Sequence, residues 1–207
     1  MAWPDFTDLQ TRVRDLLNES TAGFYTDDQI KRWVNDGERD VAMKGLCIES
    51  INALTTTAHT RLVSTNYNKV LYVEYNDIGL VKINPTMVGH LDVSGVTPQF
   101  WFPWGKDIGI EPIPGAAYSL NVYASILPSE ELVDATDEPQ IPRSFIPLVV
   151  RFAFYRALMK AGLFAKSANI YSAYIYGLQE ARDNIVQKWK NTMADTRVPE
   201  KTVVSEV

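Results

Sequence analysis

The cysteine and two histidines are the side chains most suited to nucleophilic catalysis or metal binding. Their spacing in the sequence predicts neither a nucleophilic pair nor a metal site. Cys47 lies between Leu46 and Ile48, and neither His59 nor His90 stands at a metal-ligand spacing from it or from the other. No H-E-x-x-H or C-x-x-C motif occurs. A cysteine among apolar neighbours is typically a buried, inert thiol. We therefore predict no metal, no cofactor and no catalytic residue, and we do not expect an enzyme.

Five acidic residues fall within a proline-bounded segment, where carboxylates could bind a cation or carry out acid–base chemistry. They are Glu130, Glu131, Asp134, Asp137 and Glu138. The segment lacks glycine and the D-x-D/N-x-D/N-G pattern of a calcium loop. Neither G-x-G-x-x-G nor G-x-x-x-x-G-K-S/T occurs, so no phosphate-binding loop is predicted. We interpret the acidic segment as a solvated loop.

An aromatic cluster, formed by Phe100, Trp101, Phe102 and Trp104, is the remaining candidate site. Strand alternation predicts that Phe100 and Phe102 point to one face and Trp101 to the other. One face can enter a β core. The other then offers an exposed aromatic side chain, a partner contact or a sugar-binding platform. Trp101 and Trp104 are the residues expected to face a partner or a ligand.

The elements that position these residues follow the order helix, strand, helix. T-x-x-Q capping boxes that begin at Thr7 and Thr26 predict one helix that ends near Asn18 and a second from about 27 to 44, with Gly45 just beyond it. Two further helices are predicted after the acidic segment. Ser144 caps the third, which holds Pro147 in its first turn and ends at Gly162, and the fourth covers about 165–193, roughly 40 Å at 1.5 Å per residue.

Between the helices the apolar period shortens towards two, which is typical of strands. Leu120, Val122 and Ala124 alternate with polar or amphipathic residues, as in a half-buried strand. The predicted strands cover 70–75, 79–83, 99–102, 108–111 and 118–124. Several short strands at this spacing suggest a small sandwich or open barrel.

These elements predict an α+β fold that is mainly α. A bundle of about four helices would comprise residues 5–45 and 143–193. An inserted small antiparallel β domain with the acidic loop would comprise 46–142. Residues 194–207 lack apolar periodicity and are expected to form an extended C-terminal tail.

Composition and charge exclude several classes of protein. The net charge is −5 and the pI about 5.1, with no Lys/Arg cluster, which argues against tight DNA binding but permits a wall that DNA slides past. A single cysteine suits synthesis in a reducing cytoplasm. Met1–Asp5 has no signal-peptide features, and the apolar run Phe145–Met159 is interrupted by Arg151 and Arg156, so we predict no membrane span.

Several segments, taken in order, resemble the head-to-tail adaptor proteins of tailed bacteriophages. Tyr25–Asp36 (YTDDQIKRWVND) resembles an N-terminal helix of that family, and Ile108–Pro114 (IGIEPIP) and Leu120–Tyr123 (LNVY) resemble two of its strands. Asp137–Pro142 (DEPQIP) is similar to the segment that leads into its third helix. The tyrosine-rich last helix completes a resemblance over roughly residues 5–190. It departs from the family pattern at 55–67 and is hard to place at 87–97.

This resemblance implies a non-enzymatic virion protein, made in the host bacterial cytoplasm, that forms a dodecameric ring between portal and tail. The helices would surround a channel through which DNA passes without sequence-specific binding, and the β insertion would project outward or downward toward tail or nozzle proteins. The C-terminal residues expected to bind the portal are Arg197, Val198, Lys201, Val203, Val204 and Val207. Pairing across subunits is expected of Arg182, Lys188 and Lys190. Trp101 and Trp104 would face the tail.

One other function stays open at this point. The aromatic cluster also suits a carbohydrate- or ligand-binding β module carried on a helical scaffold. Ring formation with a portal and glycan binding would distinguish the two readings.

Overall fold

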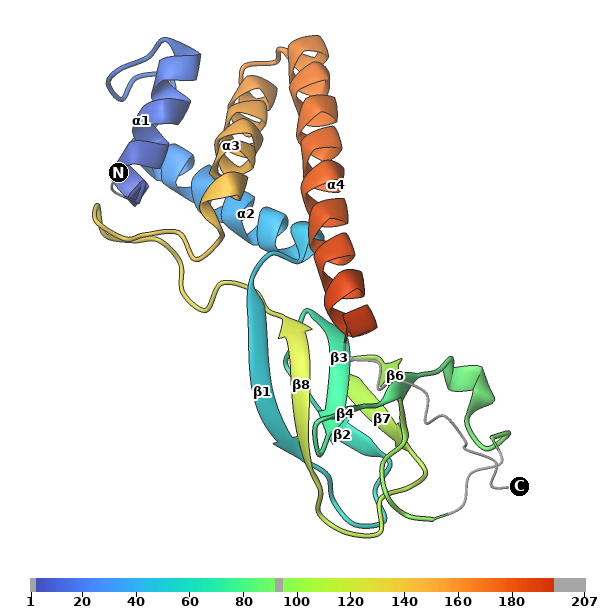
Figure 1. The fold of residues 1–207 in the computed structure, drawn as a ribbon. Coiled ribbons are helices and arrows are strands. Elements are labelled where there is room, and N and C mark those ends of the chain that lie inside the picture. Colours follow the sequence, from blue (N-terminus) through green and yellow to red (C-terminus); the bar gives the residue numbers. More distant parts are fainter. Residues whose placement is uncertain (1–2, 92–94, 196–207) are drawn as a thin grey trace.

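The computed structural model describes residues 3–91 and 95–195, and side chains as far as residue 189. The helices gather at one end and the strands at the other, and α4 runs from the helical part to the sheets (Figure 1). The helices are α1 (Phe6–Leu17), α2 (Asp27–Gly45), α3 (Ile146–Lys160) and α4 (Phe164–Asp195). None of the described helices is long and apolar enough to cross a membrane.

The helix starts follow the sequence signals in part. The capping box of α2 is confirmed, since Thr26 and Gln29 each bond the other's backbone N–H. The predicted cap of α1 is wrong. Asp5 caps that helix by accepting from the Asp8 N–H at 2.8 Å, while the Thr7 hydroxyl donates to the Ala135 carbonyl at 3.0 Å. Thr7 is therefore engaged in a tertiary contact with the acidic loop.

Two boundaries near glycine and serine also differ from prediction. Gly45 is the last residue of α2, and Leu46 adopts the left-handed conformation after it, with φ of 55°. A Cβ at Gly45 would lie 3.2 Å from the Phe145 ring and 3.3 Å from Leu178, so a larger residue would require these side chains to shift by a few tenths of an ångström. Ser144 lies in a 3₁₀ turn and makes no capping bond to α3.

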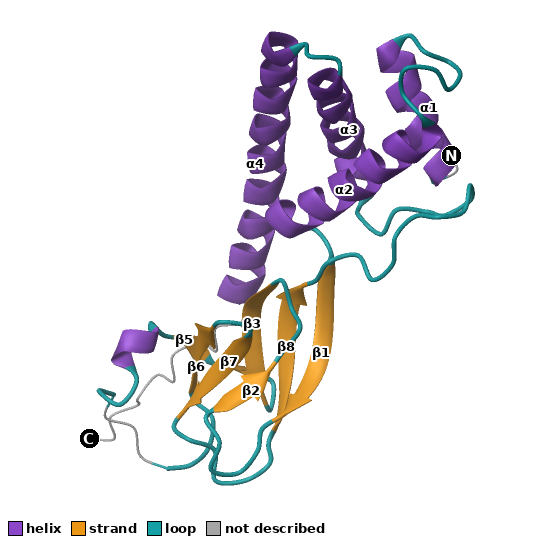
Figure 2. Ribbon diagram, turned by 180° about the vertical axis from the view of Figure 1, so that it is seen from behind, coloured by secondary structure: helices purple, strands orange, loops and turns teal. Residues whose placement is uncertain are grey.

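Within the described residues, eight strands form two four-stranded sheets, ordered β1-β8-β3-β4 and β2-β7-β6-β5. All neighbours are antiparallel except β5 and β6. The sheets stack on each other (Figure 2). The strands are β1 (Glu49–Thr55), β2 (Leu62–Ser64), β3 (Lys69–Tyr75), β4 (Ile78–Gly79), β5 (Val81–Lys82), β6 (Phe100–Trp104), β7 (Asp107–Glu111) and β8 (Ser119–Ser125).

The strand predicted over 79–83 is divided between the sheets. The Leu80 N–H bonds to the Val73 carbonyl in the first sheet, whereas the Val81 N–H bonds to the Gln99 carbonyl beside the second. The chain therefore changes sheets between these two residues. β1 and β2 were not predicted. The α+β class is confirmed, with helices and two small sheets.

Buried side chains form two clusters. One lies among the helices and includes Leu132 and Ile141 of the acidic loop, so that loop packs on the helical part. The other lies between the two sheets, and both contribute to it. Its members are Val63, Val73, Leu80, Trp101, Ile108, Ile110, Leu120, Val122 and Ala124. The sandwich that the strand spacing suggests is thus the arrangement observed.

Candidate interaction surfaces

The groups most suited to chemistry are held apart or buried. Cys47 lies in the helical core, and burial raises the pKa of its thiol to about 12, so the thiol stays protonated at neutral pH. His59 and His90 are exposed in loops of the β part. Within the described residues, no three His, Cys, Asp or Glu side chains are grouped as metal ligands.

The acidic loop is fixed to the helices by hydrogen bonds. Asn35 of α2 accepts from the Leu132 N–H at 2.8 Å and donates to the Leu132 carbonyl at 2.9 Å. Asp137 accepts from the N–H groups of Val133 and Asp134 at 2.7 and 2.8 Å. These bonds lower the pKa of Asp137 and occupy its carboxylate with the loop's own backbone. The acidic loop is therefore an ordered connection between the last strand and the third helix, held by its own hydrogen bonds and by those to α2.

Glu38 of α2 is the buried polar contact between this loop and the helices. It is 2% exposed, and its carboxylate accepts from the Gln140 N–H at 2.7 Å. Burial raises its pKa, while backbone hydrogen bonds from Gln140 and Ile141 lower it by less. The folded chain therefore retains this proton at a pH where the unfolded chain has lost it.

Glu38→Gln is expected to remove the contribution of Glu38 to the change in the free energy of unfolding with pH. Because the folded pKa is raised, the contribution of Glu38 is present below its ordinary value of 4.5 and is lost as pH rises through the folded value. The wild-type free energy of unfolding, minus that of Glu38→Gln, should therefore fall between pH 4 and pH 7. Urea titrations across this range measure the difference, and a constant difference would contradict the assignment.

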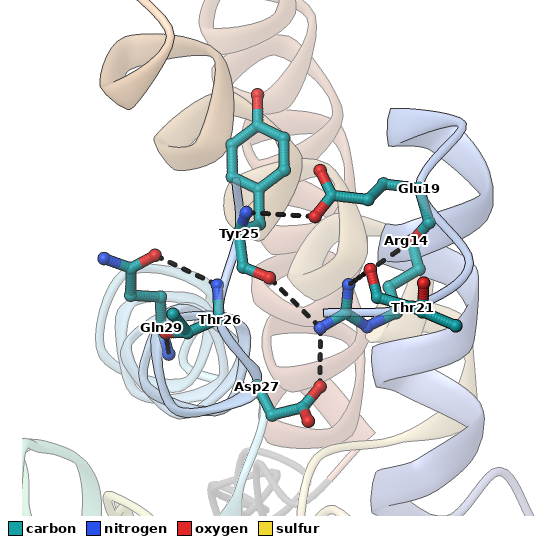
Figure 3. Close-up of polar contacts among 7 residues, drawn as sticks. All are labelled: Arg14, Glu19, Thr21, Tyr25, Thr26, Asp27 and Gln29. Carbon is teal, nitrogen blue, oxygen red and sulfur yellow. Dashed lines mark hydrogen bonds and ion pairs between the residues drawn. The ribbon is translucent and has the colours of Figure 1, made fainter. Parts of the chain in front are cut away.

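A buried arginine holds the connection between α1 and α2 (Figure 3). Arg14 is 8% exposed. Its guanidinium donates to the carbonyls of Glu19, Thr21 and Tyr25 at 3.3–3.4 Å and pairs with Asp27 at 2.5 Å. The Glu19 carboxylate accepts in turn from the Tyr25 N–H at 3.1 Å. These contacts join the end of α1 to the start of α2.

The aromatic cluster is divided between the two faces of β6. Trp101 pairs in register with Ile110, is 1% exposed and belongs to the core between the sheets. Trp104, three residues on, points to the opposite face and is 56% exposed. Residues an odd number of positions apart lie on opposite faces of a strand, so Trp101 and Trp104 cannot both face a partner. The expectation that both do is therefore corrected for Trp101, which is buried.

A cleft of about 400 Å³ lies beside Trp104 on the outer face of the second sheet. Phe102 forms one wall and is buried because its ring lies over Gly109, where a Cβ would lie 2.0 Å from the ring. The lining residues are Arg61, Leu62, Pro85, Val88, Phe102 and Trp104. The cleft is open and lined mainly by apolar side chains, and exposed apolar surface of this kind commonly marks a binding site.

Comparison of the sequence with known protein families identifies the family of this chain. A family model described as SU10 adaptor protein matches residues 4–199, nearly the whole chain. The chain belongs to the SU10 adaptor family. No curated protein matches it. Membership makes it a structural adaptor of a bacteriophage, a virion component that associates with other head and tail proteins.

In this SU10 adaptor, the cationic residues expected at subunit interfaces differ in setting. Lys188 pairs with Glu49 of its own chain, with Nζ 3.1 Å from Oε2. Arg182 is exposed on α4, and the side chain of Lys190 lies outside the described residues. The six residues expected to bind the portal, Arg197, Val198, Lys201, Val203, Val204 and Val207, also lie outside the described residues.

The last turns of α4 contact the first sheet of the adaptor through one carboxylate and one ring pair. The Trp189 indole N–H donates to Glu49 Oε1 at 3.0 Å, and its ring lies 6.0 Å from that of Tyr123. The Tyr123 hydroxyl then donates to Glu74 at 2.9 Å. Trp189 falls within the predicted fourth helix, but the sequence did not reveal this contact, because Glu49 and Tyr123 lie 140 and 66 residues away along the chain.

Proposed function

We propose that the chain forms a dodecameric ring between portal and tail, extends the DNA channel and recruits tail proteins. Membership of the SU10 adaptor family carries this proposal. The exposed apolar side chains of the helices support it, since a ring subunit must bury two flanks against its neighbours. They include Leu16 of α1, Met43 of α2, Met159 of α3, and Phe164, Tyr171 and Tyr176 of α4.

The parts of the chain have different roles in this proposal. The helices, residues 5–45 and 143–193, form the bundle of the ring wall, and the β domain with the acidic loop, 46–142, projects toward tail proteins. Residues 194–207 bind the portal, and Arg182, Lys188 and Lys190 lie at subunit interfaces. The acidic net charge of −5 suits a wall that repels DNA phosphates and binds no sequence.

Truncation after Asp195 is expected to abolish portal binding, because it removes the proposed docking segment. Mass photometry of the full chain with the portal from the same genome should show a complex that gains a full ring of subunits. The truncated chain should leave the portal at its own mass. A chain with residues 196–207 in scrambled order is the matched control, and it should behave like the truncation. Failure of the full chain to associate at any ratio would exclude the adaptor assignment.

A second candidate function rests on the cleft beside Trp104. An exposed tryptophan above an apolar cleft can stack on a sugar ring, so a glycan-binding β module is the alternative. A glycan array distinguishes the two functions. Binding that is lost in Trp104→Ala, with no portal association, would favour the glycan module.

A further inference from the structure

Strand β1 lies at an edge of the first sheet, and among the strands that the structure describes it pairs only with β8. It has seven residues, whereas the other edge strands, β4, β5 and β2, have two, two and three. Proteins commonly keep edge strands short because an unpaired edge can accept another strand. β1 is therefore the long accessible edge among the described residues.

The register shows which backbone groups of β1 lack a strand partner. The Ile126 N–H bonds to the Ile48 carbonyl, and the Thr56 N–H bonds to the Tyr118 carbonyl, both at 2.9 Å. In an antiparallel ladder, bonded and non-bonded pairs alternate, so even-numbered residues of β1 bond to β8. The N–H and C=O groups of the odd-numbered residues point away from β8. Among the described backbone groups, none bonds to them, and they belong to Glu49, Ile51, Ala53 and Thr55.

The edge carries few of the usual features that prevent strand addition, and its one charged residue, Glu49, lies at the start of the strand and is paired with Lys188. β1 has no proline, lysine or arginine, and its pairing with β8 runs without a bulge. The pairing of β3 with β8, by contrast, shifts between Val70 and Tyr72. An unbroken row of donors and acceptors is complementary to the backbone of an extended polypeptide.

A cavity of about 350 Å³ lies next to this edge, beside Ile51, which is 64% exposed. It is lined by Glu49, Ile51, Tyr123, Lys188 and Trp189. The Glu49 carboxylate is engaged by the Lys188 ammonium and the Trp189 indole, so the charges in the wall are paired with each other. An uncharged, large apolar side chain fits such a cavity.

We propose that β1 accepts an extended segment of a tail protein as a fifth strand of the first sheet. Main-chain hydrogen bonds to the outward-pointing groups of Ile51 and Ala53 would hold the strand, and a large apolar side chain entering the cavity would select it. The identity of the donor as a tail protein rests on the proposed function, in which the sheets face the tail.

Ala53→Pro tests this proposal, with Ala53→Val as its matched control. The Ala53 N–H points outward, so proline removes a donor that β8 does not use, and edge strands tolerate proline at such positions. Ala53→Pro should bind the portal as the wild type does and bind isolated virion tails at least about tenfold more weakly. Ala53→Val should bind both like the wild type. Wild-type tail binding by a folded Ala53→Pro overturns the proposal.

Hydrogen exchange on the wild-type chain gives a second test that does not depend on how the variant folds. Binding of isolated tails should slow exchange at the amides of Ile51 and Ala53 by about tenfold or more, while Asn52 and Leu54 are already slow in the free chain. Unchanged exchange in the complex overturns the proposal. Protection in the free chain that disappears on truncation after Asp195 also overturns it, since the chain's own C-terminal segment would then occupy the edge. If the wild-type chain does not bind the portal, that result contradicts the proposed function and not the strand-addition proposal.

Discussion

Trp101→Ala is expected to lower the free energy of unfolding by about 4 kcal/mol. The Trp101 ring is 1% exposed between the two sheets, where it packs with the apolar side chains of both. Its removal loses the transfer free energy of a large ring and leaves a cavity that the surrounding strands fill only in part. Urea unfolding followed by circular dichroism measures the loss.

Trp104→Ala is the matched control for that substitution. Its ring is 56% exposed on the outer face, so the same chemical change should alter stability by no more than about 0.5 kcal/mol. A large loss for Trp104→Ala together with a small one for Trp101→Ala would reverse the assignment of the two faces. The pair thus separates the core residue from the surface residue without knowledge of any partner.

Arg14→Met is expected to lower the free energy of unfolding by about 2 kcal/mol. Methionine preserves the apolar stem but removes the donors that serve three carbonyls and Asp27. The bond to the Tyr25 carbonyl is buried, so that acceptor loses a partner that water does not readily replace. The same variant should speed amide exchange in the connection between α1 and α2, which hydrogen exchange measures directly.

Asp27→Asn provides the control for the charge of this cluster. The Asp27 side chain is largely exposed, so its ion pair with Arg14 is screened by solvent and loss of the charge should lower stability by less than about 1 kcal/mol. Equal effects of the two substitutions would show that the ion pair, and not the three carbonyl contacts, accounts for the role of Arg14.

Local signals placed many of the elements. The capping box at Thr26 and Gln29 predicted the start of α2 because its contacts lie within four residues. Alternation over 118–124 predicted β8, whose buried apolar residues Leu120, Val122 and Ala124 are those of the pattern. The division of 79–83 between two sheets was not predictable, because Leu80 and Val81 select different partners from distant parts of the chain.

The buried polar residues that join loops to helices were harder to predict from the sequence than the helices and strands. Glu38 falls between Val34 and Val41 on the apolar stripe of α2, and a charged residue at such a position indicates a buried partner without naming it. Arg14 adjoins Val13 on the buried side of α1 in the same way. Their partners are backbone N–H groups and carbonyls of loops, which every residue has, so the sequence does not show which of them will be bonded.

The sequence by itself determined that helices flank a region of strands, that no motif for metal or phosphate binding occurs, and that the chain resembles head-to-tail adaptors, which the family match confirms. These features depend on local periodicity, capping and residue type, which a linear chain displays. Only the tertiary structure decided that Trp101 is core and Trp104 surface, that the acidic loop is bonded to α2, and that β1 is an open edge. Each of these depends on which distant backbone groups pair, and pairing is settled by the packing of whole sheets and helices against one another.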